Sequence, residues 1–479
     1  MADSEIERLR DAIDCAWEEA HKFGLDPFPT HFELVPASIM YEFASYGLPG
    51  RFSHWTHGKS YYRQKMQYDF GLSKIYEMVV NTNPSYAFLM EMNNLLQNTF
   101  VAAHVFGHTD FFKNNAYFQN TSRRMIDKVS IHAERVAKYE FDHGKAEVER
   151  FLDAALSIQE HVDYNLLLRG NENAKKDEQK PTQVTSEYDD LWGLEKKAKK
   201  AEEDRERRPG KPPKFPEKPE KDILQFLMRY APHLQPWQRD LIEIVRTEML
   251  YFIPQAQTKV MNEGWASLWH SRIMRQLAEL GVINSSEFLE FAQLHSGVLS
   301  PSRTSLNPYY LGFKMFEDIE QRWDNPTDEE REKTGRKPGM GHQKIFEVRE
   351  LDNDVSFLRN YLTKDLIKDL DLYLFKKDGD EWVISEKNWE KVRDGIVASM
   401  TNFGYPYLVV DNGDYRGNRE LYIKHMFEGQ ELDLNYAEKT LQHVYTMWGR
   451  PVHLETVYEG KRILLTYDGE RNSKSTLEK

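Results

Sequence analysis

The sequence predicts a mainly α-helical protein that ends in a small α+β domain. Apolar residues recur at helical spacing over most of the chain up to about residue 323. The pattern changes near residue 371, where short alternating segments typical of strands flank glycine-containing turns. Because 479 residues exceed what one ordinary core accommodates, we expect more than one domain.

Composition divides the chain into six segments. A stretch rich in charge and proline, with almost no apolar residues, separates two parts of a helical core and predicts a solvated, disordered tether. A second polar stretch follows the core. The expected segments are helical core 1–167, tether 168–221, helical core 222–323, connector 324–370, α+β domain 371–470 and disordered tail 471–479.

Local signals place individual elements. Ser4 and Glu7 form a capping-box pattern at the start of the first helix. The segment from Pro84 to Lys113 is predicted as one apolar, central helix. We expect Pro254 to break the helical pattern ahead of a further helix. In the last domain, the order β-α-β-β-α-β with one more strand is typical of a ferredoxin-like sandwich.

Charge and cysteine content limit the function classes. The net charge of −13 disfavours nucleic acid as a partner, because phosphate backbones are bound by clustered Lys and Arg. The sequence has no apparent secretory signal and no stretch of 18 apolar residues, so we expect no membrane span. Cys15 is the single cysteine, which excludes an intramolecular disulfide and favours a cytoplasmic location.

Two distant segments carry candidate metal ligands. His104 and His108 are four residues apart and therefore share one helix face. In Asn262-Glu263-Gly264-Trp-Ala-Ser, the glycine allows the carboxylate to approach another helix closely, and His270 follows two turns later. These side chains suit a divalent ion, zinc first and manganese second. The alternatives are satisfied core histidines and a buried Glu–His ion pair.

The two segments resemble the two halves of a gluzincin metallopeptidase site, the HExxH helix and the Asn-Glu-Gly-(aromatic)-Ala segment. In that family the glutamate of HExxH is the general base, and this chain has Val105 in its place. The resemblance implies a metal site and leaves catalysis open. Glu91 and Glu248 are candidates for a substitute base.

Further polar residues are candidates to line a site. His54 and His57 lie in a loop-like segment, and Gln97 extends the face of His104 backward along its helix. His295 and Arg303 lie in a second irregular segment, where the arginine could clamp a carboxylate or phosphate. Aromatic packing and surface turns are the alternatives.

Four long motifs resemble the stage V sporulation protein R family. They are Tyr41 to Lys59, Gly71 to Glu77, Ala103 to Asn115 and Met261 to Ser267, and the segment from His295 to Gly312 also fits. The resemblance implies a cytoplasmic bacterial protein involved in making the peptidoglycan cortex of the endospore, and it supplies no agreed biochemical activity.

Two functional hypotheses follow. One is a metal-dependent hydrolase of a peptide-like or amide substrate. The other is a non-catalytic regulator or scaffold of cortex assembly that binds protein partners through the C-terminal domain and the tether.

Overall fold

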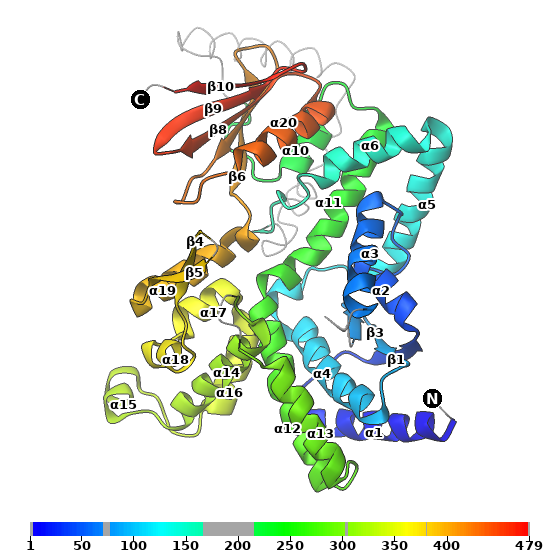
Figure 1. The fold of residues 1–479 in the computed structure, drawn as a ribbon, viewed down its shortest axis with the longest axis vertical. Coiled ribbons are helices and arrows are strands. Elements are labelled where there is room, and N and C mark those ends of the chain that lie inside the picture. The colour runs from blue at the N-terminus through cyan, green and yellow to red at the C-terminus, as the bar shows by residue number, and fades with distance from the viewer. Residues whose placement is uncertain (1–2, 70–76, 166–214, 302–304, 380, 478–479) are drawn as a thin grey trace, which may run out of the picture. The chain divides into compact units, whose positions relative to one another are not determined.

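The computed structural model describes residues 3–69, 77–165, 215–301, 305–379 and 381–477 (Figure 1). The chain forms two compact units. Unit 1 comprises residues 1–149 and 247–405, and unit 2 comprises residues 150–246 and 406–479. The predicted class, mainly helical with a C-terminal α+β part, is confirmed. Residues 166–214, which make up most of the expected tether, lie outside the described residues.

Unit 1 contains most of the helices. Two of them, α6 and α11, cross the boundaries between the units. The helices of unit 1 are α1 (Asp3–Lys22), α2 (Ala37–Tyr46), α3 (Trp55–Asp69), α4 (Leu95–Asn114), η1 (Ala116–Phe118), α5 (Met125–His143), α6 (Lys145–Leu156), α11 (Pro236–Gln257), α12 (Lys259–Glu279), α13 (Ser285–Val298), α14 (Pro308–Asp324), α15 (Asp328–Thr334), α16 (Gly341–Leu351), α17 (Asp354–Tyr361), α18 (Lys364–Asp369), α19 (Trp389–Met400) and η2 (Thr401–Gly404).

Helix α4 is the centre of unit 1. Sixteen of its 20 residues are buried, which fits a helix that is apolar around its circumference. Helices α1 and α12 both pack on it, and α12 in turn packs on α14 (Figure 1). Its start is fixed by a capping box, in which Asn94 accepts from the Gln97 backbone and the Gln97 side chain accepts from the Asn94 backbone.

A three-stranded sheet precedes α4 and corrects the prediction of one helix from Pro84 to Lys113. The strands are β1 (Thr30–Val35), β2 (Glu77–Val80) and β3 (Ser85–Met90), in the order β1-β3-β2. β3 pairs in parallel with β1 and antiparallel with β2. A short apolar run such as Ser85–Met90 fits a buried strand as well as a helix, and tertiary pairing decides between them.

Helix α11 also differs from the prediction. It continues through Pro254 and ends at Gln257, so the break falls at Thr258, just before α12. The Thr258 hydroxyl donates a hydrogen bond to the Pro254 carbonyl. Proline inside a helix removes one backbone hydrogen bond and its ring clashes with the preceding turn, which is why the sequence alone favours a break at Pro254.

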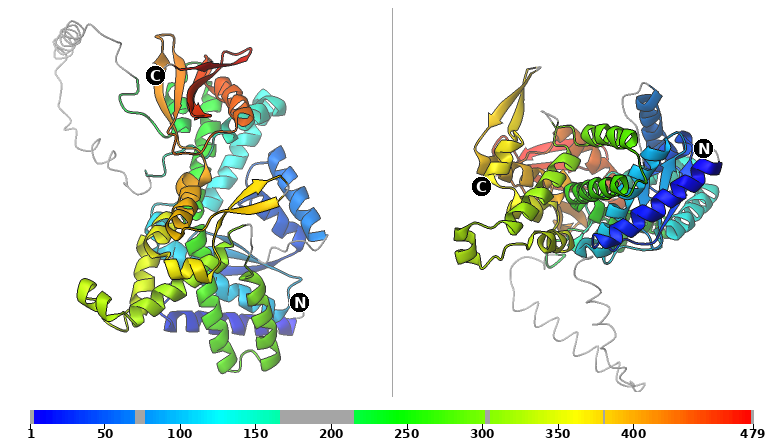
Figure 2. Two further views of the ribbon diagram at one scale, coloured as in Figure 1. Left: turned by 60° about the vertical axis from the view of Figure 1, so that its left-hand side comes forward. Right: turned by 90° about the horizontal axis from the view of Figure 1, so that it is seen from below.

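The expected connector 324–370 contains regular structure. It includes α15 to α18, and Ile345 of α16 and Phe357 of α17 are fully buried in the core. The hairpin of β4 (Leu374–Asp378) and β5 (Glu381–Glu386) belongs to unit 1 and forms a sheet of its own, seen as a separate ribbon in Figure 2.

Unit 2 is built on a five-stranded sheet of order β10-β9-β8-β7-β6. Helix α20 connects the parallel pair β7 and β8, whereas the other neighbours are antiparallel. The order differs from a ferredoxin-like sheet, because successive hairpins pair in sequence and only one helical crossover occurs. Its elements are α10 (Ile223–Tyr230), β6 (Leu408–Tyr415), β7 (Glu420–His425), α20 (Leu434–Trp448), β8 (Val452–Tyr458), β9 (Lys461–Tyr467) and β10 (Asn472–Thr476).

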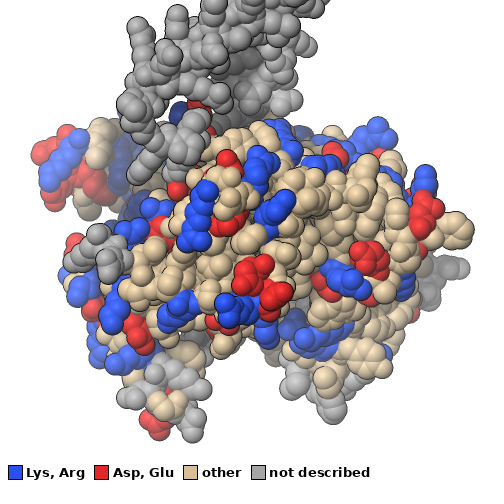
Figure 3. All heavy atoms as spheres, turned by 90° about the horizontal axis from the view of Figure 1, so that it is seen from above, with Lys and Arg blue, Asp and Glu red and all other residues tan. Residues whose placement is uncertain are grey.

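The C-terminal segment 471–479 was expected to be a disordered tail. It contains β10, which pairs with β9 from Asn472 to Thr476. On the face in Figure 3, Lys and Arg side chains are interspersed with Asp and Glu. Within the described ranges, no helix is long and apolar enough to cross a membrane.

Candidate metal centre

Helices α4 and α12 bring the two predicted histidines and the predicted glutamate together. Glu263 Oε2 lies 3.6 Å from His104 Nε2 and 3.5 Å from His108 Nε2. The helices approach closely here because Gly107, between the histidines, faces Ala266: a Cβ at Gly107 would lie 2.6 Å from the Ala266 Cα atom. The i, i+4 spacing and this close crossing together place one carboxylate between two imidazoles.

Glu77, the first residue of β2, completes the cluster. Its Oε1 lies 3.9 Å from His104 Nε2, and the ligand atoms of Glu77, His104 and His108 all lie within 4.8 Å of one another. Neither predicted base is in this position. Glu91 is exposed, and Glu248 pairs with Arg51 and His132. Glu77 was missed as a site residue although it ends one of the family-like motifs.

The other ring nitrogens of the two histidines are held by side chains of α12. His108 Nδ1 lies 2.9 Å from Asn262 Oδ1, and His104 Nδ1 lies 2.8 Å from His270 Nδ1. His270 Nε2 continues to His295 Nδ1 at 2.8 Å. Both Nε2 atoms therefore face the carboxylates, an arrangement typical of metal-binding histidines and their supporting shell.

His270 therefore lies behind His104 and away from Glu263. Seven residues return a side chain to nearly the same face of a helix but move it about 10 Å along the axis. That displacement puts His270 on the far side of His104, where it contacts His295 rather than the carboxylates.

Helix α14 supplies Tyr309, which sequence reasoning did not single out. Its hydroxyl hydrogen bonds with Glu263, and its ring stacks on His104 with centroids 6.0 Å apart. The predicted role of Gly264 is confirmed at this crossing: a Cβ there would collide with the backbone of Gly312 on α14.

Burial and mutual charge set the protonation of the cluster. Burial raises the pKa of Glu77, with Glu263 adding to the rise, while nearby His104 opposes it. For Glu263, burial is outweighed by His104, His108 and Tyr309, so its pKa is lowered. Burial would lower the pKa of His104, but Glu263 and Glu77 raise it overall, whereas burial and His104 lower the pKa of His108 to about 4. Of the two imidazoles, His104 therefore binds a second proton more readily than His108 does.

Buried polar contacts fix the two helices around the cluster. Asp110, two residues beyond His108, accepts hydrogen bonds from the Trp265 indole and the Asp26 backbone. Asp354 accepts from the backbone N–H groups of Val260 and Met261 and so caps the start of α12. Asp110 thus links α4 to α12 directly, and Asp354 ties the start of α12 to α17.

The cluster has two buried atoms with unmet bonding capacity. Neither His104 Nε2 nor Glu263 Oε2 has a hydrogen-bond partner among the residues that the structure describes. A buried polar atom without a partner costs about 1–3 kcal/mol, unless a further group satisfies it. Two imidazole nitrogens and carboxylate oxygens form a donor set that a divalent ion such as zinc accepts.

The remaining predicted site residues have other surroundings. His57 packs against the rings of Tyr46 and Phe52, and His54 lies near it with ring centroids 5.9 Å apart. The Gln97 side chain serves the capping box of α4. Arg303 lies outside the described residues.

The fold and the cluster define a mainly helical protein with a paired-histidine, paired-carboxylate site. The model for SpoVR like protein matches residues 3–405, and the model for the SpoVR-like C-terminal domain matches residues 406–459. The chain belongs to the SpoVR family, and this membership suggests a sporulation-related function.

A relative from Escherichia coli (strain K12), uncharacterized protein YcgB, is 30% identical over 471 residues, which is 93% of this chain and 91% of the relative. No solved structure matches.

Proposed function

We propose that this protein is a divalent-metal-dependent hydrolase of an amide bond, with His104, His108 and Glu263 as metal ligands and Glu77 as the general base. The observation that carries the proposal is the convergence of two imidazole Nε2 atoms on Glu263 Oε2 at 3.5 and 3.6 Å. Zinc is the expected ion, because it favours histidine and carboxylate ligands in catalytic sites.

The division of roles between the two carboxylates rests on their positions. Glu263 reaches both imidazoles, as a ligand of a shared ion must. Glu77 comes from a different element, and its distance to His104 Nε2 is longer, at 3.9 Å. It can therefore act beside the ion as the general base. In a gluzincin this role belongs to the glutamate of HExxH, whose place Val105 occupies here. Val105 itself is fully buried in the hydrophobic core.

A bound divalent ion supplies Lewis acidity at this position. Glu77 takes a proton from the attacking water as the carbon–oxygen bond forms, and returns it to the leaving nitrogen as the carbon–nitrogen bond breaks. Tyr309 and Asn262 orient Glu263 and His108 through the contacts described above.

Metal analysis of purified variants tests the ligand assignment. The wild type is expected to hold one equivalent of metal, which Glu263→Gln and His104→Gln lose. Glu91→Gln, a change of an exposed carboxylate ahead of α4, is the control and keeps it. Glu77→Gln keeps the metal and loses hydrolysis. No metal in the wild type, or equal metal in Glu263→Gln, would overturn the site.

The biological process is proposed from the family resemblance. We place the activity in formation of the endospore peptidoglycan cortex, acting on an amide in a precursor or in a protein that controls one. In a spore-forming host that lacks its own family member, the wild type is expected to restore cortex and Glu77→Gln to fail. Restoration by Glu77→Gln would show that hydrolysis is not the function.

A further inference from the structure

A groove lies between α1 and β1, on the face of α4 opposite the histidine cluster. Its cavity volume is about 460 Å³, within the range of roughly 300–1,000 Å³ that small-molecule sites occupy. Its lining is mostly apolar and includes Ile6, Ile13 and Trp17 from α1, Phe32 and Leu34 from β1, and Phe106 from α4.

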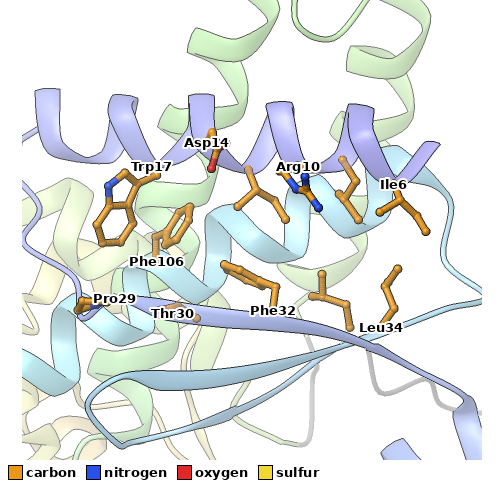
Figure 4. A pocket seen from close by; sticks show the side chains of 12 residues that line it. Ile6, Arg10, Asp14, Trp17, Pro29, Thr30, Phe32, Leu34 and Phe106 are labelled. Atoms are coloured by element: carbon orange, nitrogen blue, oxygen red, sulfur yellow. The ribbon is translucent and has the colours of Figure 1, made fainter. Parts of the chain in front are cut away.

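No side chain among the residues that the structure describes fills this groove. Leu9, Ala16 and Ala20 of α1 are buried, whereas Ile6 on the same helix remains 37% exposed. In Figure 4, the aromatic rings of Trp17 and Phe106 gather at one end of the groove, and Ile6 and Leu34 lie at the other. Trp17 and Phe106 meet edge to face at 5.2 Å, which makes a rigid apolar wall.

Two charges on α1 lie along this apolar surface. Arg10 is exposed, and Figure 4 shows its guanidinium directed from α1 toward β1. It makes no ion pair with any residue in the described part of the chain. Asp14, one turn further along α1, also lines the groove. The arginine attracts an anion, and the neighbouring carboxylate disfavours a doubly charged one.

We propose that this groove binds a small amphipathic monocarboxylate, with its apolar body between α1 and β1 and its carboxylate on Arg10. The site is separate from the proposed metal centre, because α4 presents Phe106 to the groove and His104 and His108 to the carboxylates.

Calorimetric titration of the full-length protein with decanoate tests the site. Decanol, which lacks the charge, and decyl phosphate, which carries more of it, are both expected to bind more weakly than decanoate. Arg10→Gln should weaken decanoate binding roughly two- to fivefold, as for an exposed ion pair, and leave decanol binding unchanged.

Arg8→Gln is the matched control, because Arg8 is exposed on the same helix and lies 4.0 Å from Glu287 rather than in the groove. It should leave decanoate binding unchanged. Ile13→Trp fills the groove and should abolish binding of both decanoate and decanol. Equal binding of decanoate and decanol to the wild type, or equal effects of the two arginine changes, would overturn the proposal.

Discussion

Gly107→Ala is a direct perturbation of the close crossing of α4 and α12. The added Cβ would lie 2.6 Å from the Ala266 Cα atom and 3.1 Å from its Cβ atom. The nearest atom belongs to the backbone, so no side-chain rotation can relieve the overlap. The two helices must separate by about 1 Å to reach ordinary contact distance, which moves both histidines away from Glu263.

The size of the effect follows from two opposing contributions. Alanine is a better helix former than glycine by about 1 kcal/mol, which favours the variant. Overpacking a buried position costs about 1–3 kcal/mol, and more where the backbone has to shift. We expect a net loss of up to about 2 kcal/mol in the free energy of unfolding, together with weakened metal binding.

Gly58→Ala in α3 is the matched control, because an added Cβ there meets no atom within 4 Å. It should keep or slightly raise the free energy of unfolding, by up to about 1 kcal/mol. Urea denaturation and metal titration of both variants measure the difference. If Gly107→Ala were as stable as Gly58→Ala and bound metal equally well, the inferred helix crossing would be wrong.

Three other predictions concern polar groups. Burial raises the pKa of Asp354 to about 7, although the backbone N–H groups of Val260 and Met261 donate to it. The folded state therefore holds the Asp354 proton more tightly than the unfolded state does. This proton contributes to the free energy of unfolding in full below about pH 4, and the contribution is lost as the pH rises to about 7, a decrease of up to about 4 kcal/mol. Urea midpoints between pH 4 and 7 should show this loss in the wild type and not in Asp354→Asn; parallel profiles would refute it. His270→Gln removes the support behind His104 and should weaken metal affinity about 10–100-fold by competition titration, and an unchanged affinity would exclude a supporting role. Asp222→Ala leaves Arg246 without its buried partner at 2.7 Å and should destabilise unit 2 by about 3–5 kcal/mol. The control Asp328→Ala removes an exposed pair with Arg331 and should change the free energy of unfolding by less than about 1 kcal/mol. Equal urea midpoints for the two variants would contradict this.

The parts of the site that share one helix were predictable from sequence. The spacing of His104 and His108 fixes them on one face, and Gly264 permits a close helix crossing whatever the partner. The choice of partner was not predictable, since the backbone that Gly264 approaches belongs to Gly312 on α14. The sequence therefore shows that a close approach is possible at Gly264, but the helix that approaches it is determined by tertiary packing.

Glu77 could not be assigned to the site from the sequence alone. It lies 27 residues before His104 on a short strand, and its position depends on the pairing of β2 with β3. The register that brings Glu77 opposite Leu89 is set by long-range contacts. The same contacts decide that Ser85–Met90 forms a strand, which its apolar run alone cannot distinguish from a helix.

X-ray absorption spectroscopy of the metal-loaded protein identifies the atoms that coordinate the proposed ion. We predict one divalent ion per chain with two imidazole ligands and at least one carboxylate in its first shell, at about 2.0–2.2 Å. His108→Gln, like His104→Gln, should lose the metal and with it the imidazole signal. A first shell without imidazole, or a spectrum unchanged in His108→Gln, would contradict the proposed metal centre.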